Sequence, residues 1–290
     1  MAIPDYLISL LRVEGVFSNY NIFLLAVAAF WLIIASIQDF RRREVENWWN
    51  FSLIVVVLAF RLFVSVFENN YSYILWGMVG LGFGFILMNL FYYGRMFGGG
   101  DAKMLMALGT VIPLSLEWSI NLKLALMFIL LLLVAGAFYG MIYGIFVTLL
   151  NFKKFLFEFK KTYGKYKIIS FSILWMGVLG FGILYYLNIV LFAWLVLIYS
   201  VCPFLLIWAK AIEISGMAKI VDVKSLTIGD LIIGNVKIGK MRIMPSWDGL
   251  SEKELKIIQS KYKKKVTIKY GVPFMPAFLI TLLLMIWLML

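Results

Sequence analysis

Histidine is absent from this sequence, and cysteine occurs once, as Cys202 within an apolar run. Without histidine the chain cannot build a histidine-ligated zinc or haem site, or pair a serine or cysteine nucleophile with histidine. A single cysteine excludes an internal disulfide and a cysteine-ligated zinc motif, so Cys202 is interpreted as a buried structural thiol. The sequence therefore predicts neither a metal nor a cofactor.

Charged residues are also scarce. They make up 14% of the chain, whereas 63% of its residues are hydrophobic and the mean hydropathy is +0.96. This composition predicts a polytopic membrane protein surrounded by a lipid bilayer. A net charge of +12 would suit nucleic acid, but the positive residues are concentrated in a few loops and one hydrophilic segment. Cytoplasmic loops of membrane proteins have this distribution, so no nucleic-acid partner is expected.

Apolar runs long enough to cross a bilayer recur along the chain. They predict an α-helical membrane protein of about eight transmembrane helices with a small cytoplasmic α+β domain. The expected spans are residues 20–37, 48–67, 73–93, 102–116, 124–150, two within 168–208, and 272–290. The pair within 168–208 is expected to turn near residues 186–188. Residues 1–18 predict a short interfacial helix, and the absence of a basic segment at the start argues against a cleavable signal peptide.

Arginine and lysine set the expected orientation. Arg41, Arg42 and Arg43 follow the first span, which places this end in the cytoplasm and the N-terminus outside. Residues 151–167 hold six lysines and one glutamate and are expected to form a cytoplasmic loop near anionic lipid. Arg61, inside the second span, is expected to be paired or to extend its charged end outward.

The hydrophilic segment 210–271 is predicted to be a soluble, β-rich cytoplasmic domain between a membrane domain, 1–209, and a last transmembrane helix, 272–290. Residues 217–223 and 230–243 alternate apolar with polar residues and contain turn-forming glycines, which predicts short antiparallel strands. Ser251 and Glu254 form a capping-box pattern that opens a helix, and residues 266–268 predict a closing strand.

Two aspartates lie at expected membrane boundaries, where an acid is costly and therefore a functional candidate. Asp39 ends the first span, and Asp101 follows three glycines ahead of the fourth. Counting spans places both on the cytoplasmic face. Each has a plainer interpretation: Asp39 is neutralised by the neighbouring arginines, and Asp101 is a solvated acid in a flexible loop.

Taken together, the two acids suit amide hydrolysis. Neighbouring carboxylates share a proton, so an ionised one can take a proton from water while the protonated one supports the carbonyl oxygen and later supplies the leaving amine. Asp39 and Asp101 are therefore predicted to be catalytic. Gly98 and Gly100 are assigned to the catalytic loop, because glycine has no side chain to obstruct a substrate backbone and can adopt a positive φ. Lys103 either orients a carboxylate, steadies the loop or faces lipid phosphate.

These residues resemble a known family. Gly98-Gly99-Gly100-Asp101 resembles the GxGD signature of intramembrane aspartic proteases, and Lys103 fits the GxGDxK context of type IV prepilin peptidases and archaeal preflagellin (prearchaellin) peptidases. Residues 39–48 resemble the other half of their site, with Val45-Glu46 where isoleucine and proline are usual. Residues 249–254 and 271–279 are similar to the C-terminal part of the archaeal members.

The resemblance implies a membrane aspartic endopeptidase that removes short basic leader peptides from type IV prepilin-like or prearchaellin precursors. It implies a multi-pass protein of the cell membrane with its active site at the cytoplasmic face. A membrane transporter, or a non-catalytic pilus-assembly factor, could use the same acidic pair. A presenilin-like protease would have a tyrosine beside its first aspartate, whereas Gln38 and Phe40 flank Asp39.

Overall fold

The structure is a computed structural model that describes residues 18–238, 241–246, 249–262 and 264–290. The chain divides into two units. The first contains residues 1–141 and 272–290, and the second contains residues 142–271. The helix α6, Trp118–Leu150, begins in the first unit and ends in the second. The predicted division into domains 1–209, 210–271 and 272–290 remains a prediction.

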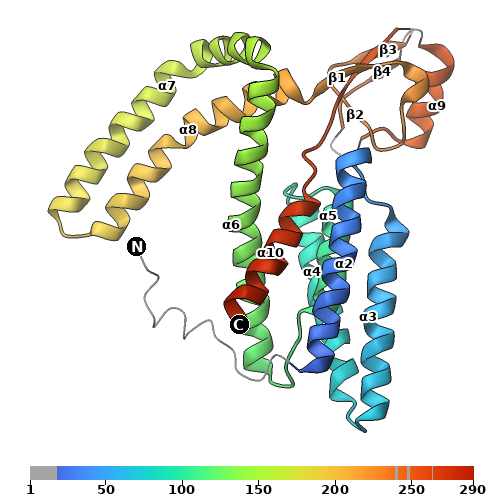
Figure 1. The fold of residues 1–290 in the computed structure, drawn as a ribbon. Coiled ribbons are helices and arrows are strands. Elements are labelled where there is room, and N and C mark those ends of the chain that lie inside the picture. The colour runs from blue at the N-terminus through green and yellow to red at the C-terminus, as the bar shows by residue number, and fades with distance from the viewer. Residues whose placement is uncertain (1–17, 239–240, 247–248, 263) are drawn as a thin grey trace. The chain divides into compact units, whose positions relative to one another are not determined.

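The first unit is a helical bundle (Figure 1). Its further helices are α2 (Asn19–Arg42), α3 (Asn47–Phe67), α4 (Ser72–Tyr93), α5 (Gly99–Val111) and α10 (Met275–Met289). The first three coincide with predicted spans because their apolar runs are long and continuous. Ser18 caps α2 by accepting from the Asn21 N–H at 3.2 Å, and Arg43 ends it in the left-handed conformation, with φ 60°. The chain thus reverses direction before α3.

Six of the described helices are long and apolar enough to cross a membrane: α2, α3, α4, α6, α7 (Phe152–Tyr186) and α8 (Val190–Gly216). The helices α5 and α10 contain 13 and 15 residues and are shorter than the usual span of about 20. The protein is therefore a mostly helical chain with six candidate membrane spans, and helix length does not establish the predicted number of eight. The interfacial helix expected at residues 1–18 falls almost wholly outside the described residues.

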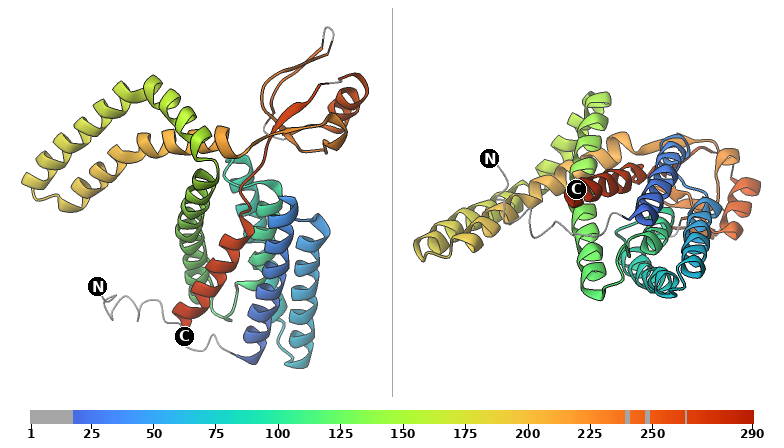
Figure 2. Two further views of the ribbon diagram at one scale, coloured as in Figure 1. Left: turned by 45° about the horizontal axis from the view of Figure 1, so that its top comes forward. Right: turned by 60° about the horizontal axis from the view of Figure 1, so that its bottom comes forward.

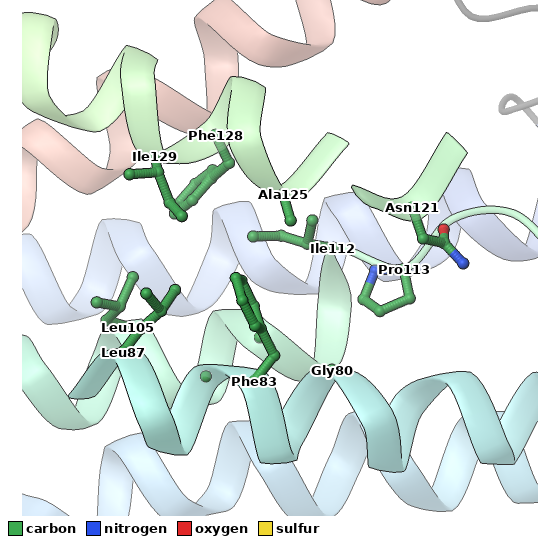
Figure 3. Close-up of a pocket in the computed structure, with 12 residues that line it drawn as sticks. Gly80, Phe83, Leu87, Leu105, Ile112, Pro113, Asn121, Ala125, Phe128 and Ile129 are labelled. Carbon is green, nitrogen blue, oxygen red and sulfur yellow. The ribbon is translucent and has the colours of Figure 1, made fainter. Parts of the chain in front are cut away.

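Close glycine contacts join α4 to α5. A Cβ atom at Gly84 would lie 2.8 Å from the backbone oxygen of Met106, and one at Gly109 would lie 2.9 Å from the Cα atom of Gly84. Small residues let membrane helices approach this closely. Beside this contact is a small apolar cavity of ≈ 40 Å³, into which Leu87, Leu105 and Phe128 point (Figure 3). Neither predicted catalytic aspartate lines it.

In the second unit α7 and α8 run side by side (Figure 2). They turn between Tyr186 and Val190, so the predicted hairpin is confirmed. The lysine-rich loop expected at 151–167 is wrong, because α7 begins at Phe152 and includes this segment. Lysine is a good helix former, and Phe155, Phe159 and Tyr163 follow one another on one helix face, with ring centroids 5.5 and 6.0 Å apart.

A small α+β module follows α8. Strand β5 (Val266–Lys269) pairs antiparallel with β1 (Ala218–Val221) and β2 (Leu231–Ile232), and β3 (Val236–Ile238) pairs with β4 (Met241–Ile243). The 3₁₀ turn η1 spans Val223–Ser225, and α9 spans Glu252–Lys261. The predicted closing strand and the capping box of Ser251 and Glu254 are confirmed. Helix α8 continues to Gly216, so the first residues of the predicted soluble segment are helical.

Candidate active site

The two predicted catalytic aspartates come together in the first unit. Asp39 lies in the last turn of α2, with 5% of its surface exposed, and Asp101 lies half-buried in the first turn of α5. The antiparallel helices α3 and α4 return the chain from one to the other. The carboxyl groups are close enough for their charges to interact. The structure therefore brings together two acids that are 62 positions apart in the sequence.

The glycines before Asp101 form a helix start rather than a loop with positive φ. Gly98 is the N-cap of α5, with φ −68° and ψ 164°, and Gly99 is its first residue. A backbone hydrogen bond from Gly98 reaches the Asp101 carboxylate, so Asp101 helps to cap its own helix. No positive φ is needed here, because a helix N-terminus requires only extended and right-handed conformations.

A Cβ atom would fit at Gly98 and Gly100 without a clash. A Cβ atom at Gly98 would lie 3.5 Å from Oδ2 of Asp101, and one at Gly100 would lie 3.9 Å from the backbone of Val45. Both distances are ordinary contacts, so the packing of the described protein atoms does not itself require glycine.

Two polar contacts join the start of α3 to the start of α5. Lys103 Nζ donates to Oδ1 of Asn47 at 2.7 Å, and Asn50 Nδ2 donates to the carbonyl of Gly100 at 3.2 Å. Of the three roles considered for Lys103, the structure favours steadying the helix start. Asn50 is fully buried, and its Oδ1 accepts no hydrogen bond from the described residues.

Asn50 was not predicted from the sequence. A signal was present, because Asn50 follows Asn47 by three residues and therefore lies on the same face of an otherwise apolar helix. The turn at Val45-Glu46 leads directly into α3. Glu46 is the N-cap of α3 and forms an ion pair with Arg42, and Val45 is buried against the bundle.

The N-terminus of α10 also reaches the acid pair. The backbone N–H of Met275 donates to Oδ2 of Asp39 at 3.0 Å, and Phe274 supplies a second backbone hydrogen bond to the same carboxylate. Phe274 packs against Phe97 and Phe278, with ring centroids 5.3 and 5.8 Å apart. No local sequence pattern predicts this contact, because 236 positions separate its partners.

Arg61 fixes the far end of α5. It is 4% exposed, and its guanidinium donates to the carbonyls of Thr110, Val111 and Pro113, and to that of Tyr73 at 3.3 Å. The first two of these distances are 3.0 and 3.1 Å. Arg61 is thus paired with backbone oxygens that a helix C-terminus leaves free, and the alternative of an outward-extended side chain is wrong.

The comparison with known families agrees with this geometry. Residues 26–152, which contain both aspartates, Asn50, Arg61 and Lys103, match the type IV leader peptidase family. The match covers 127 of the 290 residues of the chain. The matched region ends at Phe152, the first residue of α7, and does not include α10.

Three curated relatives are preflagellin peptidases. The protein from Methanococcus maripaludis is 34% identical over 152 residues, which cover 50% of this chain and 64% of the relative. Those from Methanocaldococcus jannaschii and Methanococcus voltae are each 34% identical over 87 and 88 residues, covering 30% of this chain and 37% of each relative. The chain therefore spans less than two thirds of the length of these relatives. No solved structure gives a significant match.

Proposed function

We propose that this protein is a membrane aspartic endopeptidase that removes short leader peptides from precursors of the prepilin or prearchaellin type. The observation that supports this most strongly is the meeting of Asp39 and Asp101 within a region that matches the leader peptidase family. The named relatives act, by their names, on preflagellin, and a substrate of the same class is proposed for this chain.

The chemistry follows from the acid pair. One carboxyl group is ionised and takes a proton from a water molecule, and the other is protonated and supports the carbonyl oxygen of the scissile amide. Two like charges so close together do not both ionise readily, so the pair holds a single proton between them. Because Gly98 and Gly100 have no side chains, they would let an extended peptide approach Asp101 closely.

The proposed arrangement in the membrane has eight helices, with α5 and α10 entering the bilayer as the two shorter ones. The acid pair then lies at the cytoplasmic face, on the side of Arg41, Arg42 and Arg43. A leader with basic residues ahead of an apolar helix would present its cleavage point at this depth. Both acids lie near helix ends, which suits a peptidase better than a transporter with a binding site at the membrane midplane.

The test is cleavage of a prepilin-like precursor by purified protein in lipid. Asp39→Asn and Asp101→Asn should each lower the rate by more than the 10²–10⁴-fold typical of general acid–base groups, because the water is no longer activated. The double variant should be no slower than either single variant, since the two acids act as a unit.

Asp222→Asn is the matched control, because this exposed acid is paired only loosely with Lys265, at 3.8 Å, and lies in the second unit. It should cleave at the wild-type rate. Substantial cleavage by a folded Asp39→Asn or Asp101→Asn protein would refute the proposal and favour a transporter or an assembly factor.

A further inference from the structure

Helix α10 has no polar side chain of its own with which to cap its N-terminus. The helix begins at Met275, and the N-cap residue is Phe274. The first backbone N–H groups of a helix have no partner within the helix and need one from elsewhere. Asp39 of α2 provides it, by accepting from the N–H groups of both residues, and α10 packs against α2. A carboxylate thus caps this helix from a distant part of the chain.

This contact favours a negative charge on Asp39. The N-terminus of a helix carries a partial positive charge, and a hydrogen bond to an ionised acceptor is about twice as strong as one to a neutral acceptor. Arg43 adds a favourable charge interaction with the same group. A protonated Asp39 would lose much of each of these interactions.

Asp101 is placed differently. It accepts one backbone hydrogen bond, from Gly98, and it lies beside the carboxylate of Asp39. The charged residue of α5 nearest Asp101 in the sequence, Lys103, donates to Asn47 of α3. Helix α10 contains no charged residue, and the charged residue of α3, Arg61, is bound at the opposite end of α5. If only one of the two acids is ionised, it should be Asp39, because the backbone donors and Arg43 stabilise its carboxylate.

We propose that the N-terminus of α10 is a positioning element of the acid pair, whose Phe274 and Met275 N–H groups hold Asp39 as the carboxylate and general base and leave Asp101 as the general acid. This assignment of roles rests on the proposed function. Nothing in the family match assigns a role to α10, because the matched region ends at residue 152.

The proton transfers balance under this assignment. Asp39 takes a proton from water as the water oxygen bonds to the carbonyl carbon, and Asp101 gives its proton to the carbonyl oxygen. The resulting diol then collapses: the carbon–nitrogen bond breaks, Asp39 gives its proton to the leaving nitrogen, and a diol hydroxyl returns a proton to Asp101. The net reaction adds one water, and each acid ends in its starting state.

The first experiment measures which acid ionises more readily, without using catalysis. Infrared spectra of the protonated carboxyl group are recorded against pH for Asp101→Asn, which retains Asp39, and for Asp39→Asn, which retains Asp101. We expect Asp39 to lose its proton at a pH about one unit or more below that of Asp101, because a charge-assisted hydrogen bond is involved. Equal titration of the two acids, or the reverse order, would overturn the proposal.

The second experiment removes the donor from α10. Met275→Pro eliminates the N–H at the first helical position, where proline is tolerated, and Met275→Ala truncates the side chain but keeps the N–H. In the Asp101→Asn background, Met275→Pro should raise the pH at which Asp39 titrates by about one unit relative to Met275→Ala. Equal titration in the two variants would mean that the N–H does not hold the charge, which refutes the proposal.

The results of these titrations can be interpreted independently of whether the proposed function is correct. The titrations need no substrate, so they report on α10 and Asp39 even if the precursor is not cleaved. If Met275→Pro fails to fold, the comparison of the two single-acid proteins still decides the proposal.

Discussion

The tight contact between α4 and α5 predicts that replacing glycine by alanine destabilises the protein at one position of α4 and stabilises it at another. A Cβ atom at Gly80 would lie 2.6 Å from Cγ of Pro113, and closer still to the backbone oxygen of Gly109. At Gly82 the same atom would have no described neighbour within 4 Å. Gly80→Ala should therefore force the two helices apart, whereas Gly82→Ala should fit without any movement.

The size of the effect follows from these distances. Ordinary contacts of a Cβ atom are 3.4–4 Å, and neither a backbone carbonyl nor a proline ring can rotate away as a flexible side chain would. Overpacking of this kind costs about 1–3 kcal/mol, whereas replacing glycine by alanine within a helix gains about 0.5–1 kcal/mol. We expect a net loss of stability for Gly80→Ala and a small gain for Gly82→Ala.

Thermal unfolding in detergent, followed by circular dichroism, measures both variants against the wild type. A change of 1 kcal/mol corresponds to roughly 2–4 °C in Tm for a domain of about 150–250 residues. Gly80→Ala should also cleave precursor more slowly, because a displaced α5 carries Asp101 away from Asp39. A Tm for Gly80→Ala equal to or above that of Gly82→Ala would refute the packing argument.

Two further predictions concern the polar residues that fix α5. Arg61→Met leaves the buried carbonyls at the C-terminus of α5 without their donor, which costs about 1–3 kcal/mol for each unpaired group. Its Tm should therefore fall well below that of Arg61→Lys, which keeps one donor group. Equal Tm values for the two variants would contradict this role of Arg61. Asn50→Ala removes the donor to the Gly100 carbonyl. We expect kcat for precursor cleavage to fall by about 10²-fold while the protein still folds, because a small misplacement of catalytic groups slows the reaction strongly. A wild-type kcat would show that Asn50 has no positioning role.

The sequence by itself determined most of the local structure. Continuous apolar runs set α3, α4 and the start of α2 to within one residue, because a helix that crosses a bilayer must be long and apolar, whereas α2 continues five residues beyond its predicted end. Ser251 and Glu254 set the start of α9, since a capping box depends on residues three positions apart. The sequence also singled out Asp39 and Asp101, because an acid at a membrane boundary is rare and costly. Local rules failed at the lysine-rich segment, where helix propensity and a line of aromatic rings outweighed its charge.

Only the tertiary structure decided what surrounds the two acids. The N–H of Met275 bonds to Asp39 across 236 positions, and Arg61 bonds to the end of α5 across about 50. Asn50 reaches Gly100 across 50 positions. Such contacts leave no periodic pattern in the sequence, because they depend on which helices pack together and in which register. The residues that perform the proposed chemistry were therefore visible in the sequence, but the groups that position them became visible only in the folded bundle.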